Sequence, residues 1–555
     1  MRRIFFVLWC LMAISACENE TSEEEESHGK SVFRYNEAFG ITSLDPAFAR
    51  NFENIAAINQ LFNGLVQMNE KLQVIPCIAK RWEISEDGLV YTFYLRDDVY
   101  FHDHELFKDG KGRKATASDF VHSFYRIIDP KIVSPGAWIF NDVDLSKKSN
   151  YSGFIAPDDT TLQIYLKNPF PPFLSILTMQ YCSVIPHEIV EYYGDDFRNN
   201  PVGTGPFKFK SWKEGIKLVM VKNENYFEKD GSEQLPYIDA ISISFIKERQ
   251  SEFMGFVRGD FDLLSGIDGI FKDELLTLTG GLNPVYKDKF IMQNIPFLKT
   301  DYMGILVDES LENVKKSPLK YKAVRQAINY GFNREEMIKF LRNNIGTPAS
   351  AGFVPQGMPS FDSTKVKGYY YDPEKARDLL FQAGFPNGDG LPEITLSTTA
   401  MYQDLSEFIQ KQLAVIGIKI KLDVLPAAIH TELTARSALN FFRKSWVADY
   451  PDAENYFALF CSKNFCPEGP NYTHFSNKAY DELYEKAKSE INDSLRYELY
   501  RKMDNIIIEE APIIPLYYDQ AVRFYPINIT GIEINPMNLL TLKRVKKVKK
   551  HENSN

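Results

Sequence analysis

From about residue 300 onward the chain alternates between strand-like and helix-like segments, and this alternation restricts the fold more than any other feature. Short apolar runs with a two-residue period occur at residues 394–396 and 418–422, and the segment between them, 404–416, has helical spacing and stops at Gly417. Alternating β and α elements are typical of an open α/β domain, in which helices cover a sheet. The second half of the chain is therefore predicted to form such a domain.

Residues 60–190 follow a different pattern, in which hairpin signals surround single helices. Thr116 followed by Asp119 indicates a capping box at the start of a helix. Apolar residues alternate after turn signals, which predicts strands at residues 89–95, 99–101 and 162–166. This block is predicted to be a mixed α and β unit with antiparallel hairpins.

Helix starts after residue 300 carry capping residues. They are found at Ser317-Pro318, at Asn333 with Glu336, and at Asp372-Pro373. Ser, Asn and Asp side chains accept hydrogen bonds from free amides at a helix start, and proline is tolerated in the first turn. Gly384 is predicted to end the third helix.

The N-terminus has the pattern of a signal peptide. Arg2-Arg3 precede an apolar run, Ile4 to Ile14, which is too short to span a bilayer. The small residues before Cys17 resemble a bacterial lipobox, so residues 1–16 are predicted to be removed and Cys17 to be lipidated; a secretory signal with an incidental cysteine is the alternative. Residues 17–31 contain the run Glu23 to Glu26 and are predicted to be a solvated tether.

The overall composition is that of an ordinary soluble globular protein, and the signal-peptide pattern predicts that it lies outside the cytoplasm. The 64 basic and 74 acidic residues give a net charge of −10, which disfavours a nucleic-acid partner. No later apolar run reaches transmembrane length. The lipid would anchor the chain either on the periplasmic side or at the cell surface. The tail from Lys543 to Lys550 is basic and is expected to be loose.

Four cysteines remain after Cys10 and Cys17 are assigned to the leader and the lipid. Cys461 and Cys466 are close enough for a small disulfide loop, with free thiols as the alternative. Cys77 and Cys182 would pair by elimination, and two buried free thiols are equally compatible with the sequence.

Catalytic and metal motifs are weak. The chain has no Gly-x-Ser-x-Gly and no Cys-x-x-Cys, and His187-Glu188 lacks the histidine that a zinc-protease helix needs at position 191. His102 and His104 would share a strand face without the fuller ligand set that metal sites have. The sequence therefore predicts no catalytic site, no metal and no cofactor.

The stretch Trp446 to Asp452 is the strongest candidate for a binding site. Asp449 lies between Trp446 and Tyr450, and an acid enclosed by aromatic rings needs a cationic partner. That partner is either in the protein or part of a ligand. The alternative is that Asp449 caps a turn before Pro451.

Several segments together resemble the ABC-transporter extracellular solute-binding proteins that carry oligopeptides and dipeptides. The matching segments run over nearly the whole mature chain: Ser43-Leu44-Asp45-Pro46, Gln60 to Val66, Ala79 to Arg96, Thr116 to Val121, Val202-Gly203-Thr204-Gly205-Pro206-Phe207 with Trp212 and Asn223-x-x-Tyr226, and Val324 to Tyr330. The resemblance implies an α/β fold of two hinged lobes, the periplasmic-binding-protein-like class II type, with an extra α+β domain inserted in the first lobe.

The resemblance also divides the chain. It implies a first lobe at 32–59, 191–297 and 517–545, an insertion at 60–190, a second lobe at 298–516 and a basic tail at 546–555. Asp449, flanked by Trp446, Ala448 and Tyr450, matches the aspartate that holds a peptide α-ammonium. Arg443 matches an arginine position for the peptide C-terminus, although it could instead face solvent or pair with a neighbouring acid.

The expected function is capture of short peptides between the lobes and delivery to an ABC permease, by a monomer without catalysis. One alternative within the same fold is a non-peptide solute such as a nickel chelate, a haem or a glycan. A secreted peptidase and a ligand sensor without transport are further alternatives.

Overall fold

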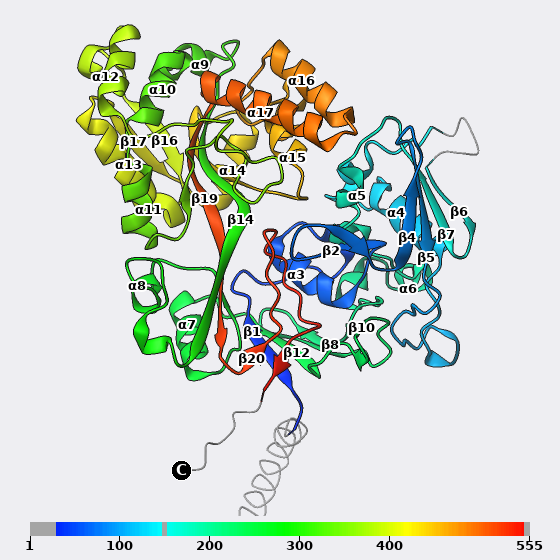
Figure 1. The fold of residues 1–555 in the computed structure, drawn as a ribbon. Coiled ribbons are helices and arrows are strands. Elements are labelled where there is room, and N and C mark those ends of the chain that lie inside the picture. Colours follow the sequence, from blue (N-terminus) through cyan, green and yellow to red (C-terminus); the bar gives the residue numbers. More distant parts are fainter. Residues whose placement is uncertain (1–28, 147–152, 549–555) are drawn as a thin grey trace, which may run out of the picture.

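The computed structural model describes residues 29–146 and 153–548, and Figure 1 shows two lobes connected by two long strands. The predicted signal peptide, Cys17 and most of the predicted tether lie outside the described residues. Within the described part of the chain, no helix has both the length and the apolar character that crossing a bilayer requires.

The first lobe is built on a four-stranded sheet in the order β1-β12-β9-β8. β1 is parallel to β12, and the other pairs are antiparallel. Helix α3 (Phe52–Leu61) packs beside this sheet. The strands are β1 (Val32–Asn36), β8 (Phe207–Lys213), β9 (Lys217–Lys222) and β12 (Ala240–Ser244). Two short antiparallel strand pairs flank it: the hairpin of β10 (Lys229–Asp230) with β11 (Glu233–Gln234), and β20 (Ile529–Thr530) with β21 (Lys546–Lys547).

The insertion contains a second four-stranded sheet, β4-β5-β7-β6, which is antiparallel throughout. Its helix α4 begins with the predicted capping box, since Asp119 accepts the Thr116 N–H at 2.9 Å. The other elements are β2 (Val66–Met68), β3 (Val74–Pro76), β4 (Ala79–Ile84), β5 (Val90–Leu95), α4 (Ala117–Ile128), β6 (Phe154–Asp158), β7 (Thr161–Tyr165), α5 (Phe173–Ile176) and α6 (His187–Tyr193).

One hydrophobic core runs without interruption through the first lobe and the insertion. It contains Phe33 and Ile241 from the first sheet together with Phe93 and Phe124 from the insertion, all fully buried. If the two parts moved relative to each other, this shared core would divide and expose apolar surface to water, which is unfavourable. The insertion and the first lobe therefore form one body.

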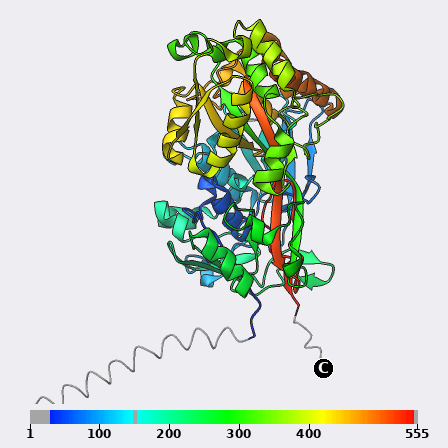
Figure 2. The same cartoon turned by 90° about the vertical axis from the view of Figure 1, so that its left-hand side faces the viewer.

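The second lobe is an α/β layer structure around a seven-stranded sheet, in which β13-β19-β14-β18-β16-β17 are in order and β15 pairs with β19. The strands are β13 (Leu264–Ser265), β14 (Phe290–Ile305), β15 (Thr347–Pro348), β16 (Ile394–Thr398), β17 (Ile420–Val424), β18 (Phe441–Val447) and β19 (Ile513–Pro526). Helices cover the upper part of the sheet (Figures 1 and 2). They are α9 (Glu312–Lys315), α10 (Lys322–Tyr330), α11 (Arg334–Arg342), α12 (Pro373–Gln382), α13 (Gln403–Val415), α14 (Ala427–Ala435), α15 (Glu454–Phe457), α16 (Lys478–Ser489) and α17 (Asp493–Glu510). Two further helices, α7 (Arg249–Arg258) and α8 (Lys272–Leu275), pack against the lower ends of β14 and β19, in the lower lobe.

β14 and β19 are the long antiparallel strands that run from the lower lobe into the upper one (Figure 1). Their ladder is irregular at two places in β14, between Pro296 and Thr300 and again between Asp301 and Tyr302. Proline lacks the N–H that a ladder needs, which accounts for an interruption beside Pro296. Pairing resumes where Thr300 lies opposite Tyr518, and it is regular again from Tyr302, which lies opposite Pro515.

The predicted α/β two-lobed fold with an inserted α+β unit is confirmed. Two local predictions are wrong. Residues 99–101 form only an isolated bridge from Tyr100 to Lys114 instead of a strand. Ser317 caps a short turn at Pro318–Lys320, and the backbone is extended at Tyr321 before α10 starts at Lys322. The caps at Asn333 and Asp372 are confirmed.

The basic tail is also not loose where the structure describes it. Lys543 pairs with Glu228, and Lys547 lies 2.6 Å from a carboxylate oxygen of Asp262. Lys546 and Lys547 form strand β21. These lysines therefore attach the end of the described chain to the first lobe. The prediction of a loose tail was wrong because the acids that face these lysines are far away in the sequence.

Candidate functional site

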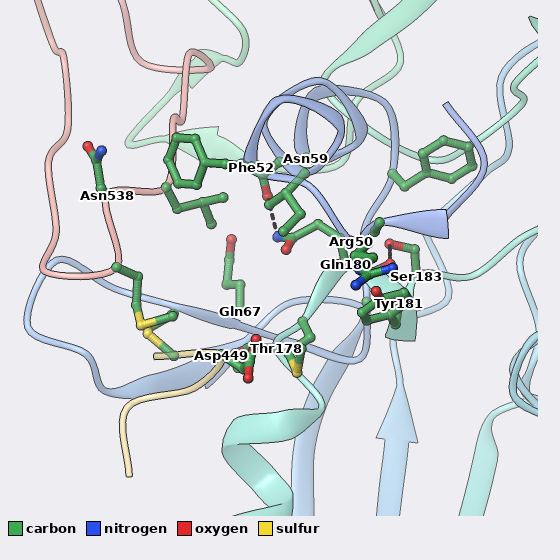
Figure 3. A pocket seen from close by; sticks show the side chains of 18 of the residues that line it. Arg50, Phe52, Asn59, Gln67, Thr178, Gln180, Tyr181, Ser183, Asp449 and Asn538 are labelled. Atoms are coloured by element: carbon green, nitrogen blue, oxygen red, sulfur yellow. Dashed lines mark hydrogen bonds between the residues drawn. The ribbon is translucent and has the colours of Figure 1, made fainter. Parts of the chain in front are cut away.

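A cavity of about 1090 Å³ lies between the two lobes. The first lobe contributes α3, β2 and the turn at residues 178–183, and the second lobe contributes Lys299, residues 447–449 and residues 467–468. The segment 535–543 closes a third side. Figure 3 shows several of these side chains directed into the space. The volume is at the upper end of the range for small-ligand sites.

Carboxamide side chains line much of the cavity. They are Asn59, Gln60, Asn63, Gln67, Gln180, Asn535 and Asn538. Some are held in place by protein contacts: Gln180 donates to Asn59 at 3.2 Å, and Gln67 donates to Glu228 at 2.7 Å. A carboxamide offers both a donor and an acceptor, as a peptide group does. This lining therefore suits a ligand that carries amide groups.

Asp449 enters the cavity just after strand β18 ends at Val447. Asn455, in the short helix α15, orients it: the Asn455 amide donates to Asp449 Oδ2 at 3.0 Å, and the Asp449 N–H donates to Asn455 Oδ1 at 3.1 Å. Trp446 Nε1 donates to the same oxygen at 2.9 Å. The aspartate and the tryptophan are thus fixed by one carboxamide.

The Asp449 carboxylate has no ion-pair partner among residues 29–146 and 153–548. The side chain is open to the cavity although protein encloses it. This enclosure raises the pKa of Asp449, because a carboxylate with less water around it is less stable, and the hydrogen bond from Asn455 acts in the opposite direction. A cation brought by a ligand would stabilise the charged form.

The neighbours of Asp449 take different places. Ala448 lines the cavity. Trp446 packs against a hydrophobic cluster of the second lobe. The Tyr450 hydroxyl donates to the buried Glu454, and its ring lies 6.4 Å from that of Trp138, which does line the cavity. Trp446 and Tyr450 therefore support the wall, and Ala448 and Asp449 form its surface.

Arg443 is not part of the cavity surface, so the expectation that it meets a peptide C-terminus is not supported. It is buried and forms an ion pair with Asp301 of β14, with its guanidinium 3.1 Å from the centre of the Tyr402 ring. Burial lowers the pKa of Arg443 to about 10. Arg443 thus pairs with a neighbouring acid, which was one of the alternatives to a role in ligand binding.

Arg443 belongs to a buried network of charges beside the irregular part of β14. Lys299 contacts Asp301 at 3.1 Å and Asp519 at 2.7 Å, and Arg342 contacts Asp519 at 2.6 Å. Burial alone would favour the protonated acid, but Arg342 and Lys299 outweigh it and lower the pKa of Asp519 to about 2. Asp519 therefore remains ionised at neutral pH.

All four cysteines of the described chain are free and buried, so the candidate disulfide between Cys461 and Cys466 is not formed. The Cys466 thiol instead lies 3.3 Å from Ser437 Oγ and 3.4 Å from His474 Nε2. Cys182 contacts the carbonyl of Ile176 at 3.6 Å. Cys77 and Cys182 are also two buried free thiols and do not form a disulfide.

Arg50 is one of the charged lining residues that the sequence did not reveal, together with Lys299, Glu468 and Lys543. It lies between the turn at Pro46–Phe48 and helix α3, next to the Ser43-to-Pro46 motif that carries part of the resemblance. Nothing in its immediate sequence distinguishes it from a surface arginine. Only the packing of that turn against the turn containing Tyr181 directs it to the cavity (Figure 3).

Comparisons with known proteins agree with this architecture. The family described as bacterial extracellular solute-binding proteins, family 5 (middle), matches residues 73–465. The dipeptide-binding protein DppE of Bacillus subtilis is 26% identical, with 97% of this chain and 96% of that protein covered. The glutathione-binding protein GsiB of Shigella flexneri is 28% identical over 89% of this chain and 90% of its own length.

Among solved structures, the periplasmic binding protein DppA of Helicobacter pylori, in complex with the peptide STSA, superposes with a TM-score of 0.77 and 26% identity. The alignment covers 94% of this chain and all of that one. The family match extends over more than half of the sequence, and the structural match includes both lobes. The chain therefore belongs to the bacterial extracellular solute-binding proteins of family 5.

Proposed function

We propose that the protein binds short peptides between its lobes, with the Asp449 carboxylate receiving the peptide α-ammonium. The observation that carries this proposal is an oriented, enclosed carboxylate without a cationic partner in the described chain. A peptide ammonium would neutralise this carboxylate and form charge-assisted hydrogen bonds with it. The carboxamide lining supports the same ligand class, as do the ligands of the relatives: a dipeptide for DppE, glutathione for GsiB and the peptide STSA for DppA.

The irregular stretch between Pro296 and Thr300 is the proposed hinge. Contacts cross from the insertion to the second lobe: among them, Lys488 Nζ lies 2.9 Å from Asp142 Oδ1, and Trp138 lies against Tyr450. A ligand that touches both walls favours the closed arrangement by its differential affinity for it. Asp449 on one wall and the amides of the other wall supply such contacts.

The finer parts of the proposal concern location and partners. An extracellular solute-binding protein of this family would deliver its ligand to ABC permease subunits, and a lipid on Cys17 would keep it at the membrane. The protein would act as a monomer without a cofactor. These statements rest on the family and on the sequence of the N-terminus.

A non-peptide solute is the second candidate within the same fold. Asp449 argues against an anionic glycan or haem, because an anionic ligand would leave two like charges enclosed together. A peptidase is less favoured, because the described lining of the cavity contains no histidine that could act as a base.

Native mass spectrometry of the purified protein tests the proposal. A ladder of short-peptide masses, displaced by added peptides, is the expected result. One defined non-peptide mass that survives peptide addition would overturn it.

A further inference from the structure

The end of helix α16 touches the insertion at a place outside the cavity (Figure 1). Lys488, in the last turn of α16, lies with its Nζ 2.9 Å from Asp142 Oδ1 of the insertion. The same Nζ lies 5.1 Å from the centre of the Phe170 ring. The residues that line the cavity do not include these three. The two lobes therefore meet here through protein groups alone.

An apolar contact lies in the next turn of the chain. Ile491, between α16 and α17, lies beside the turn at Gly88 that joins β4 to β5 of the insertion. A methyl carbon added to Gly88 would lie 3.6 Å from Ile491 Cδ1 and 3.3 Å from Pro169 Cβ. The absence of a side chain at Gly88 thus lets the insertion approach Ile491 closely.

The insertion side of this contact is firmly held. The Asp142 carbonyl accepts the Lys167 N–H at 2.8 Å, and Lys167 Nζ donates to the Asn141 carbonyl at 2.7 Å. Phe170, three residues after Lys167, belongs to the core that the insertion shares with the first lobe. Asp142 and Phe170 are therefore fixed to the body formed by the first lobe and the insertion.

The second-lobe side is connected to the other contact between the lobes. Tyr484 of α16 donates its hydroxyl to the buried Glu454, which also accepts the Tyr450 hydroxyl. The Tyr450 ring lies 6.4 Å from the Trp138 ring of the insertion. One carboxyl thus joins the helix that carries Lys488 to the tyrosine that meets Trp138, so both contacts form and separate together.

Asp142 and Lys488 depend on each other for charge neutralisation. Among residues 29–146 and 153–548, neither side chain forms another ion pair. The side chains are 23% and 31% exposed, so water is partly excluded from the pair and screens it less than a fully exposed one. Both charges lose this partner when the lobes separate. The closed arrangement therefore has a source of stability that needs no ligand.

We propose that Asp142, Phe170, Lys488 and Ile491 form a latch that holds the lobes together before a ligand arrives. As regards the ligand, this rests on the proposed peptide function. The apparent affinity of a ligand scales with the fraction of the protein that is in the binding-competent arrangement. Weakening the latch therefore weakens the binding of different peptides by the same factor. Lys488 is thus a positioning residue, which determines affinity without touching the ligand.

Small-angle X-ray scattering of the ligand-free protein tests the latch itself. Lys488→Asp and Asp142→Lys each place two like charges at the contact, and each should increase the radius of gyration. The double variant with both exchanges restores opposite charges and should return to the wild-type value. Lys463→Asp is the matched control, because Lys463 pairs with Glu485 of α16 within the second lobe. It should leave the scattering unchanged.

Calorimetric titration tests the effect on affinity. The probes are two synthetic pools, the dipeptides Ala-Xaa and the tripeptides Ala-Xaa-Ala. Lys488→Asp should bind both pools about five- to tenfold more weakly, since an attraction is replaced by a repulsion. The double exchange should recover most of this loss, and Lys463→Asp should bind as the wild type does. A residue that touched the ligand would instead affect the two pools unequally.

The outcomes separate the latch from the peptide function. Scattering of Lys488→Asp that equals that of the wild type overturns the latch and leaves peptide binding standing. A double exchange that stays as open as the single variants overturns the pairing of Lys488 with Asp142. Unchanged affinity in an opened Lys488→Asp overturns the role in affinity. Binding of neither pool by the wild type overturns the peptide function, while the scattering comparison still decides whether the latch exists.

Discussion

Asn455 orients Asp449 through two hydrogen bonds, one to its carboxylate at 3.0 Å and one from its backbone N–H at 3.1 Å. The same carboxamide oxygen accepts the Trp446 indole N–H. The proposed anchor of the ligand is thus prepared by a neighbour six residues along the chain. The order of Trp446, Asp449 and Asn455 around one short turn makes this local arrangement possible.

Replacing Asp449 tests the anchor itself. Asp449→Asn should weaken peptide binding more than about tenfold, because an enclosed carboxylate–ammonium pair loses its charge. The unliganded variant should be at least as stable as the wild type, since the raised pKa shows that the folded protein disfavours the charged form. Calorimetric titration with a peptide, together with urea unfolding, measures both effects. N-acetylated peptide is the control, and it should bind both proteins equally; unchanged affinity for the free peptide would remove Asp449 from the site.

Asn455 is expected to affect peptide affinity by orienting Asp449. Asn455→Ala removes three hydrogen bonds around the turn, and we expect about 1–3 kcal/mol less stability and a several-fold weaker peptide affinity. Urea unfolding and titration of the same samples separate the two. In Asp449→Asn, the additional loss of affinity from Asn455→Ala should be smaller than in the wild type. Equal losses in both backgrounds would contradict a positioning role.

The Arg443–Asp301 pair should affect stability rather than selectivity. Arg443→Met leaves Asp301 with Lys299 alone in a buried place, which should lower the free energy of unfolding by about 3 kcal/mol. Arg436→Gln, on an exposed i,i+4 pair with Glu432, is the control and should cost less than about 1 kcal/mol. Urea unfolding compares them. A Met variant as stable as the control would show that the pair is not required.

Asp504 makes the stability of the second lobe depend on pH. Burial raises the pKa of this carboxyl in α17 to about 7, although it accepts N–H groups of Phe353 and Val354. The folded state therefore holds a proton that the unfolded chain loses near pH 4. The Asp504 contribution to the free energy of unfolding should be greatest below about pH 4, fall as pH rises to about 7 and then stay constant.

The measurement is the difference in unfolding free energy between the wild type and Asp504→Asn at several pH values. That difference should change by roughly 2–4 kcal/mol between about pH 4 and 7 in the stated direction. A difference that is independent of pH would show that Asp504 ionises normally in the folded protein.

The sequence predicted what depends on local pattern. The caps at Asn333 and Asp372 follow from side chains next to the helix start, and the alternation after residue 300 reflects the layers of the second lobe. Asp449 was reached from a resemblance and from the chemistry of an acid between aromatic rings. Each of these signals lies within a few residues of the feature that it indicates.

What depends on partners far along the chain was not predicted. Arg443 and Asp301 meet because β18 and β14 pair with one particular register, and one strand lies about 140 residues before the other. Lys543 and Lys547 reach Glu228 and Asp262 only after the C-terminal segment returns to the first lobe. Arg50 faces a cavity for the same reason, because the wall opposite it comes from the second lobe.

The shared core of the first lobe and the insertion has a kinetic consequence. Arg50, the amides of α3 and the turn at Gln180 all belong to that one body, so their mutual geometry is independent of the distance to the other lobe. Half of the receptor surface is consequently assembled before any ligand arrives. A peptide can dock on this wall first, and the arrival of Asp449 from the other lobe then sets how long it stays.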